Sequence, residues 1–197
     1  MPPQIPSPNR RIPVEHLTPA AFASFGTVVQ NPSHAPSTAG FQSLQAVQAN
    51  QGSALKYLDV THLDNHYNLA PSRKPAKAVM NMFVCSPRTL EAADGTASQP
   101  AEQSGSADSD MGGAVRMVRA FIANGTQAVT YGPGTWHAPM VVLGAKSIDF
   151  VVVQYANGVG LEDCQEVEFK PEGGAEGINV VIDDGAFDQN MFHRAKL

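Results

Sequence analysis

Charged residues are scarce in this sequence. Asp, Glu, Lys and Arg together make up 16% of its 197 residues, and the 18 acidic residues outnumber the 13 basic ones. The resulting net charge of −5 gives no general attraction to phosphate backbones or anionic lipid, so we expect neither nucleic acid nor a membrane as a partner. No apolar run approaches the roughly 20 residues that cross a bilayer, and the Pro-rich start has no signal-peptide core. We therefore expect a soluble, intracellular protein. The composition does not exclude a small polar substrate.

Cysteine is equally scarce, and its spacing excludes the common thiol sites. Cys85 and Cys164 lie far apart and form no CxxC motif, so neither a redox pair nor a zinc knuckle is indicated. His62 and His66 are spaced to share a helical face. The Asp and Asn residues around them are more typical of a solvated turn.

Glycine (17 residues) and proline (15 residues) are plentiful, which suits short strands joined by tight turns. One helix is predicted, with Thr18 as its cap, Pro19 at its first position and Gly26 closing it. Short β-rich runs occupy residues 12–14, 27–30, 55–58, 79–84, 116–123, 127–131, 139–143, 148–154, 164–169 and 178–182. Pro13 makes the first of them an edge strand, because proline removes a ladder donor. The pattern predicts an all-β fold with a minor helix, arranged as an antiparallel meander or barrel.

The chain is long enough for one well-buried core, so residues 11–182 are predicted to form a single domain. Residues 1–10 and 183–197 are predicted to be flexible tails. Residues 91–113 consist almost entirely of small and polar residues, which cannot bury a core, and are predicted to be a disordered insert. The last three residues, Ala195-Lys196-Leu197, differ by one residue from the Ser-Lys-Leu peroxisomal address. A peroxisomal location is therefore expected, with the cytoplasm as the alternative.

Residues 124–139 hold the densest set of residues suited to chemistry. A glycine-rich turn leads from a strand to Trp136, the only Trp of the chain, and to His137 beside it. Glycines that let a ligand approach the backbone, an aromatic wall and a titratable imidazole are what a site at the mouth of a barrel needs. The alternative is that Trp136 is a core aromatic and His137 a satisfied turn residue.

The same region resembles the ureidoglycolate lyase family, in particular its fungal branch. Residues 119–131, 134–139, 149–153 and 162–167 carry the resemblance, together with an opening helix at 17–26 and a strand at 83–88. The resemblance implies a cupin-like β-barrel, usually a homodimer, that splits ureidoglycolate into glyoxylate and urea in allantoin (purine) catabolism.

Expulsion of urea from ureidoglycolate needs a base, a proton for the leaving nitrogen and groups that hold the carboxylate and the ureido end. His137 is the expected base and Tyr131 the expected proton donor, with a cross-strand aromatic as the alternative for Tyr131. The expected substrate-binding residues are Arg119 or Arg88 for the carboxylate, Asn124 and Gln127 for the ureido group, Trp136 as the aromatic wall, and Asp149. Each arginine is otherwise a surface cation, and Asp149 either orients His137 or caps the turn at Ser147. Glu162, Asp163 and Glu166 are read as a solvated acidic loop.

One stretch departs from the family pattern. Between Arg88 and Arg116 the resemblance leads us to expect a His-Pro and Gln-x-Phe-x-Pro block that contributes barrel strands and site residues, but residues 91–113 stand there instead. The first alternative function is therefore a relative that keeps the fold with impaired turnover. The second is a metal-dependent cupin enzyme, although such enzymes need a His-x-His motif with a following Glu, which the sequence lacks. We expect no metal and no cofactor.

Overall fold

The computed structural model describes residues 2–32, 44–87, 102–104, 117–171, 173–174 and 176–182. Three sequence predictions lie outside these residues: the role of Arg88, the tail at 183–197 with Ala195-Lys196-Leu197, and most of the insert at 91–113. Three residues of that stretch, Glu102–Ser104, form a strand.

The chain divides into two compact units, and each is assembled from segments that are far apart in the sequence. The first unit comprises Met1–Arg11, Leu63–Pro100 and Pro139–Asn179. The second unit comprises Ile12–His62, Ala101–Ala138 and Val180–Leu197. The single domain expected over residues 11–182 stays a prediction.

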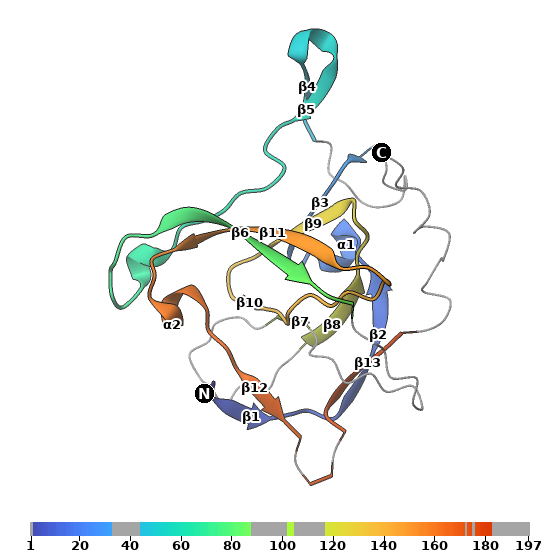
Figure 1. The fold of residues 1–197 in the computed structure, drawn as a ribbon, viewed down its shortest axis with the longest axis vertical. Helices are drawn as coiled ribbons and strands as arrows, with labels where there is room; N and C mark the ends of the chain where they lie inside the picture. The colour runs from blue at the N-terminus through green and yellow to red at the C-terminus, as the bar shows by residue number, and fades with distance from the viewer. Residues whose placement is uncertain are drawn as a thin grey trace. The chain divides into compact units, whose positions relative to one another are not determined.

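Strands dominate the described residues, and the helices are short (Figure 1). In chain order the elements are β1 (Gln4–Pro6), β2 (Arg10–His16), α1 (Pro19–Phe22), β3 (Gly26–Gln30), β4 (Ala46–Ala49), η2 (Asn50–Gly52), β5 (Ala54–Tyr57), η3 (Tyr67–Leu69), β6 (Lys77–Cys85), β7 (Glu102–Ser104), β8 (Met117–Ile122), β9 (Gln127–Tyr131), β10 (Thr135–Trp136), β11 (Ile148–Ala156), α2 (Gly160–Asp163), β12 (Glu168–Lys170) and β13 (Ile178–Val181). The predicted β-rich fold with a minor helix is confirmed. None of the described helices is long and apolar enough to span a membrane.

The described strands form one five-stranded sheet, in the order β10-β7-β8-β2-β13, and four pairs: β1–β12, β3–β9, β4–β5 and β6–β11. None of these sheets closes into a barrel within the described residues, so the cupin-like barrel stays a prediction. Two ladders, β2–β8 and β1–β12, are parallel, unlike the purely antiparallel arrangement expected from the sequence.

The core of the second unit surrounds α1. The Thr18 hydroxyl accepts a hydrogen bond from the backbone N–H of Ala21 at 3.1 Å, as predicted for the helix cap. Phe22 and Phe25, each only 1% exposed, form the centre of the core with Leu17 and Val28. Burying a side chain of this size contributes about 2–3 kcal/mol, so these two rings anchor the unit. Three partly buried residues pack against this core: Phe121, Val129 and Tyr131.

Gly26 allows β3 to approach β9 more closely than any other residue would. It pairs with Tyr131 at the end of the β3–β9 ladder. A Cβ atom on Gly26 would lie 2.0 Å from the carbonyl oxygen of Thr130, and its φ of 154° is unusual for a residue with a side chain. The absence of a side chain at this position therefore permits the close backbone contact between β3 and the end of β9, where Tyr131 lies.

The first unit is built around the antiparallel pair of β6 and β11, which lie side by side in Figure 1. Their register runs from Ile148↔Cys85 to Ala156↔Lys77. Directly opposed residues share one face of a sheet, and on one face of this pair large apolar side chains are between 46% and 72% exposed. We call this surface the apolar ladder face; its residues are Met80, Met82, Val84, Val151 and Val153.

Candidate active site

His137 follows β10 directly, and its imidazole lies flat against the ring of Tyr131. The two ring centroids are 4.0 Å apart and the ring planes differ by 1°. The Nδ1 atom of His137 lies 3.2 Å from the carbonyl oxygen of Ala138, whose side chain is buried. His137 as a whole residue is exposed, so the ring combines a stacked, fixed orientation with access to solvent.

The turn before His137 is tied to the core by one carbonyl group. The carbonyl oxygen of Phe25 accepts the backbone N–H of Gly132 at 2.7 Å and the hydroxyl of Thr135 at 2.9 Å. The Thr135 N–H in turn donates to the carbonyl oxygen of Gly132 at 3.1 Å. These bonds fix the backbone from which Trp136, 37% exposed, and His137 project.

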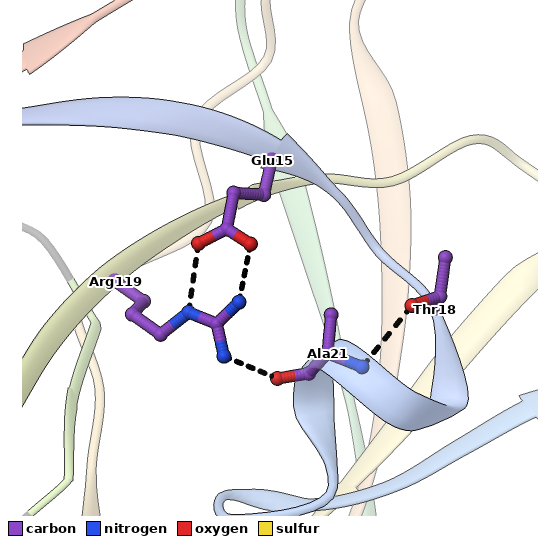
Figure 2. Close-up of polar contacts among 4 residues, drawn as sticks. All are labelled: Glu15, Thr18, Ala21 and Arg119. Atoms are coloured by element: carbon purple, nitrogen blue, oxygen red, sulfur yellow. Dashed lines mark hydrogen bonds and ion pairs between the residues drawn. The ribbon is translucent and has the colours of Figure 1, made fainter.

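Arg119 is held by neighbours within the second unit, as Figure 2 shows. Its Nε donates to one carboxylate oxygen of Glu15 at 2.7 Å, and a second nitrogen pairs with the other oxygen. The third nitrogen donates to the carbonyl oxygen of Ala21 at 2.8 Å, and the guanidinium lies 5.1 Å from the ring centroid of Phe121. The hydrogen bond from Arg119 holds the pKa of Glu15 below its usual value, and the same bond raises the pKa of Arg119. All three nitrogens of this guanidinium thus have protein partners.

Asn124 and Gln127 are engaged in the turn between β8 and β9. The side-chain oxygen of Asn124 accepts the N–H of Thr126 at 2.9 Å. The Gln127 amide donates to the carbonyl oxygen of Leu17 at 2.9 Å, and its oxygen accepts the N–H of Asn124 at 3.1 Å. Both amides hold backbone groups here, and their expected contacts with a ureido group stay predictions.

The structure thus brings Tyr131 at the end of β9 into contact with His137 directly after β10, and Trp136 is the residue before His137 in the chain. Asp149 belongs to the first unit, where it is exposed and opposite Val84 in the β6–β11 ladder. Its expected role in orienting His137 stays a prediction.

Sequence reasoning missed a polar network in the first unit. The side chain of Asn157 is only 7% exposed; its Nδ2 donates to Glu162 at 2.6 Å and its Oδ1 accepts the N–H of Val159 at 2.9 Å. The Ser72 hydroxyl also donates to Glu162, at 2.7 Å. These hydrogen bonds lower the pKa of Glu162; the bond from Ser72 has the largest effect, and the bond from Asn157 follows.

Asp163 completes this network. Its carboxylate accepts the backbone N–H groups of Asn157 and Gly158, both at 2.8 Å, and the first of these bonds is the main cause of its lowered pKa. The Tyr67 hydroxyl lies 2.9 Å from Asp163, and burial together with this contact raises the pKa of Tyr67 to about 12. Glu162 and Asp163 therefore stabilise the fold, in contrast to the solvated loop expected from the sequence.

Two open cavities are formed by described residues, one in each unit. One, of about 540 Å³, is lined by Asn31, Tyr57 and residues of the β4–β5 hairpin. The other, of about 300 Å³, is lined mainly by residues 66–71, with Glu162 and Gln165. His137 lines neither cavity, so its expected place at a barrel mouth stays a prediction. No group of three or more His, Cys, Asp or Glu residues within the described ranges is arranged to hold a metal ion.

Comparison with known proteins places this chain in a family. A sequence profile of ureidoglycolate lyase matches residues 9–99 and 101–176. The chain is 31% identical to a ureidoglycolate lyase of Schizosaccharomyces pombe over 188 residues, covering 79% of this chain and 90% of that protein. It is also 31% identical to a ureidoglycolate lyase of Saccharomyces cerevisiae, over 72% of this chain and 84% of that protein. A ureidoglycolate lyase of Burkholderia mallei is 27% identical over 73% of this chain and 82% of its own length. The chain belongs to the ureidoglycolate lyase family.

Proposed function

We propose that this protein cleaves ureidoglycolate into glyoxylate and urea, as a step of allantoin (purine) catabolism. The family membership supports this proposal, because the similarity extends over most of the chain and most of the relatives. The observation that carries it is the fixed and exposed imidazole of His137, which stacks on Tyr131 and contacts the carbonyl of Ala138. A pre-oriented, solvent-accessible imidazole is the group that proton transfer to and from a small hydroxy acid requires.

The reaction moves one proton within the substrate. Ureidoglycolate carries a hydroxyl, a carboxylate and a ureido nitrogen on one carbon. A base removes the hydroxyl proton, the oxygen electrons form the C=O bond of glyoxylate, and the C–N bond breaks with its electrons on the leaving nitrogen. That nitrogen takes up a proton and urea departs. Positioned acid–base catalysis of this kind contributes about 10² to 10⁴ in rate.

His137 is the base in this proposal, and Trp136 beside it is an apolar wall for the substrate. Arg119 is assigned to the fold rather than to the carboxylate of the substrate, because Glu15 and Ala21 occupy its nitrogens. The ureido contacts of Asn124 and Gln127 and the role of Asp149 beside His137 stay predictions.

A relative with impaired turnover is the second candidate, and it is considered because of two features of the alignments. The two matched parts of the family profile meet at residue 100, inside the polar stretch 91–113. The alignment with the S. pombe protein spans 188 residues, whereas only 79% of the 197 residues of this chain take part in it. Part of that relative therefore has no counterpart here. Loss of barrel strands would leave a pocket incomplete.

One experiment decides between the two candidates. The purified full chain is incubated with ureidoglycolate and the glyoxylate released is measured as its phenylhydrazone, with spontaneous decay of the substrate subtracted. The lyase proposal requires release that is proportional to protein concentration and well above the uncatalysed background. A rate equal to the background rules the lyase out and leaves the impaired relative.

We also propose that the protein is a homodimer. The apolar ladder face supports this, since it exposes five large apolar side chains on one sheet surface. Contiguous exposed apolar surface is uncommon on monomers and is typical of interfaces between identical subunits. The second copy is the proposed occupant of this face.

A further inference from the structure

The ring of Tyr131 connects His137 to the hydrophobic core. Its centroid lies 5.9 Å from that of the buried Phe22, and it stacks on the imidazole of His137 at 4.0 Å. The backbone of Tyr131 is fixed as well, because it pairs with Gly26 at the end of the β3–β9 ladder. A rotation of the imidazole away from this stack would lose the contact between the two parallel rings.

The contact of Nδ1 determines where the neutral imidazole carries its proton. A carbonyl oxygen only accepts hydrogen bonds, so the 3.2 Å contact between Nδ1 and the Ala138 carbonyl is a hydrogen bond only when Nδ1 carries the proton, and this geometry favours that tautomer. In the neutral ring the lone pair is then on Nε2. Ala138 itself is only 8% exposed, so this residue is packed against the protein.

We infer that Tyr131 is a positioning residue, whose ring together with the Ala138 carbonyl holds His137 as the Nδ1–H tautomer and makes Nε2 the atom that exchanges protons with the substrate. This inference rests on the proposed lyase function and deepens it. Nε2 accepts the hydroxyl proton of ureidoglycolate, and the resulting Nε2–H donates that proton to the leaving nitrogen of urea. The proton removed is the proton returned, so the step needs no other acid. Tyr131 contributes its ring and not its hydroxyl, in contrast to the proton donor expected from the sequence.

The tautomer is testable without any turnover. Nitrogen chemical shifts of ¹⁵N-histidine-labelled full chain are recorded at a pH where the imidazole is neutral, and the His137 signal is assigned by its loss in His137→Gln. We expect a protonated Nδ1 and an unprotonated Nε2 in the wild type, and a mixture of both tautomers in Tyr131→Leu. A wild-type ring protonated on Nε2, the form that free histidine favours, overturns the inference even if the enzyme is active.

The role of the ring is tested by a conservative pair of variants. Tyr131→Phe keeps the stack and removes the hydroxyl, so we expect its kcat to stay within about threefold of wild type, whereas Tyr131→Leu loses at least about tenfold. Thermal unfolding of both variants checks that the core around Phe22 persists, and Tyr57→Leu in β5 is a matched control with unchanged kcat. If Tyr131→Phe loses as much as Tyr131→Leu, the hydroxyl acts chemically and the positioning role is wrong. A wild type without activity contradicts the proposed function, while the tautomer measurement still decides the inference.

Discussion

Arg119 on β8 and Glu15 on β2 form a bidentate ion pair across the parallel β2–β8 ladder. Both carboxylate oxygens of Glu15 accept from the guanidinium, while the neighbouring residues Ala120 and Phe121 pair with Val14 and Glu15 in the sheet. The third guanidinium nitrogen donates to Ala21 of α1, so one side chain joins two strands and the helix. This arrangement indicates that Arg119 stabilises the second unit.

The first prediction follows from that ion pair. Arg119→Gln and Glu15→Gln each lower the free energy of unfolding by about 1 kcal/mol, because the two side chains are 28% and 39% exposed and solvent screens part of their attraction. Urea unfolding of the two single variants and the double variant gives the coupling energy. Turnover of folded Arg119→Gln stays near that of wild type. A large rise in KM at unchanged stability would instead indicate that Arg119 binds the substrate.

The second prediction is the pH dependence of that stabilisation. Because the bond from Arg119 lowers the folded-state pKa of Glu15, the contribution of this carboxylate is complete above its ordinary value of 4.5. It is lost as the pH falls through the lowered folded-state pKa. Urea unfolding of wild type and Glu15→Gln between about pH 7 and pH 3 should show a constant stability difference that shrinks only at the acid end. A difference that grows as the pH falls contradicts the assignment.

The third prediction compares two glycines. Gly26→Ala places a Cβ 2.0 Å from the Thr130 carbonyl oxygen, so we expect a loss of about 3 kcal/mol or more. Gly125→Ala is the matched control, because a Cβ at this position would have nothing within 4 Å, and its stability should change by less than about 1 kcal/mol. Thermal and urea unfolding measure both. Equal stability of the two variants would mean that β3 and β9 do not pair as described.

The fourth prediction concerns the apolar ladder face. Met82 and Val151 lie opposite each other in the β6–β11 ladder. Each of the single variants Met82→Lys and Val151→Lys places a charge on the apolar ladder face and should shift the protein from dimer to monomer in analytical ultracentrifugation. Met140→Lys, an equally drastic change at an exposed methionine outside the ladder, should leave the dimer intact. A wild-type protein that is monomeric at micromolar concentration contradicts the homodimer proposal.

Local signals in the sequence predicted the local parts of the fold correctly. The Thr18-Pro19 start of α1 and the extent of β9 match the structure, because capping and strand alternation are encoded within a few residues. The expected strand at 139–143 is absent; only Val142 there makes an isolated bridge, to Pro87. Strand formation at this position depends on a partner that the local sequence does not specify.

Long-range pairings were beyond sequence reasoning. Pro13 indicated an edge strand, yet β2 lies between β8 and β13, and its register with β8 begins after the proline, at Val14. Pro13 lies outside the paired residues of β2 and β8, so its missing N–H removes no hydrogen bond from that ladder. For the candidate site, the sequence placed Tyr131 and His137 on the same hairpin, but their stacking is a tertiary contact. The bond between Tyr67 and Asp163 joins residues 96 positions apart and leaves no local pattern.

In the proposed reaction, His137 performs the proton transfers of ureidoglycolate cleavage. The most direct test of this role is steady-state glyoxylate release by the wild type and by His137→Gln, an uncharged variant of similar size, with both proteins shown to be folded by circular dichroism. We predict release above the spontaneous background for the wild type and a kcat at least about tenfold lower for His137→Gln. Equal kcat values for the two proteins would exclude His137 as the base.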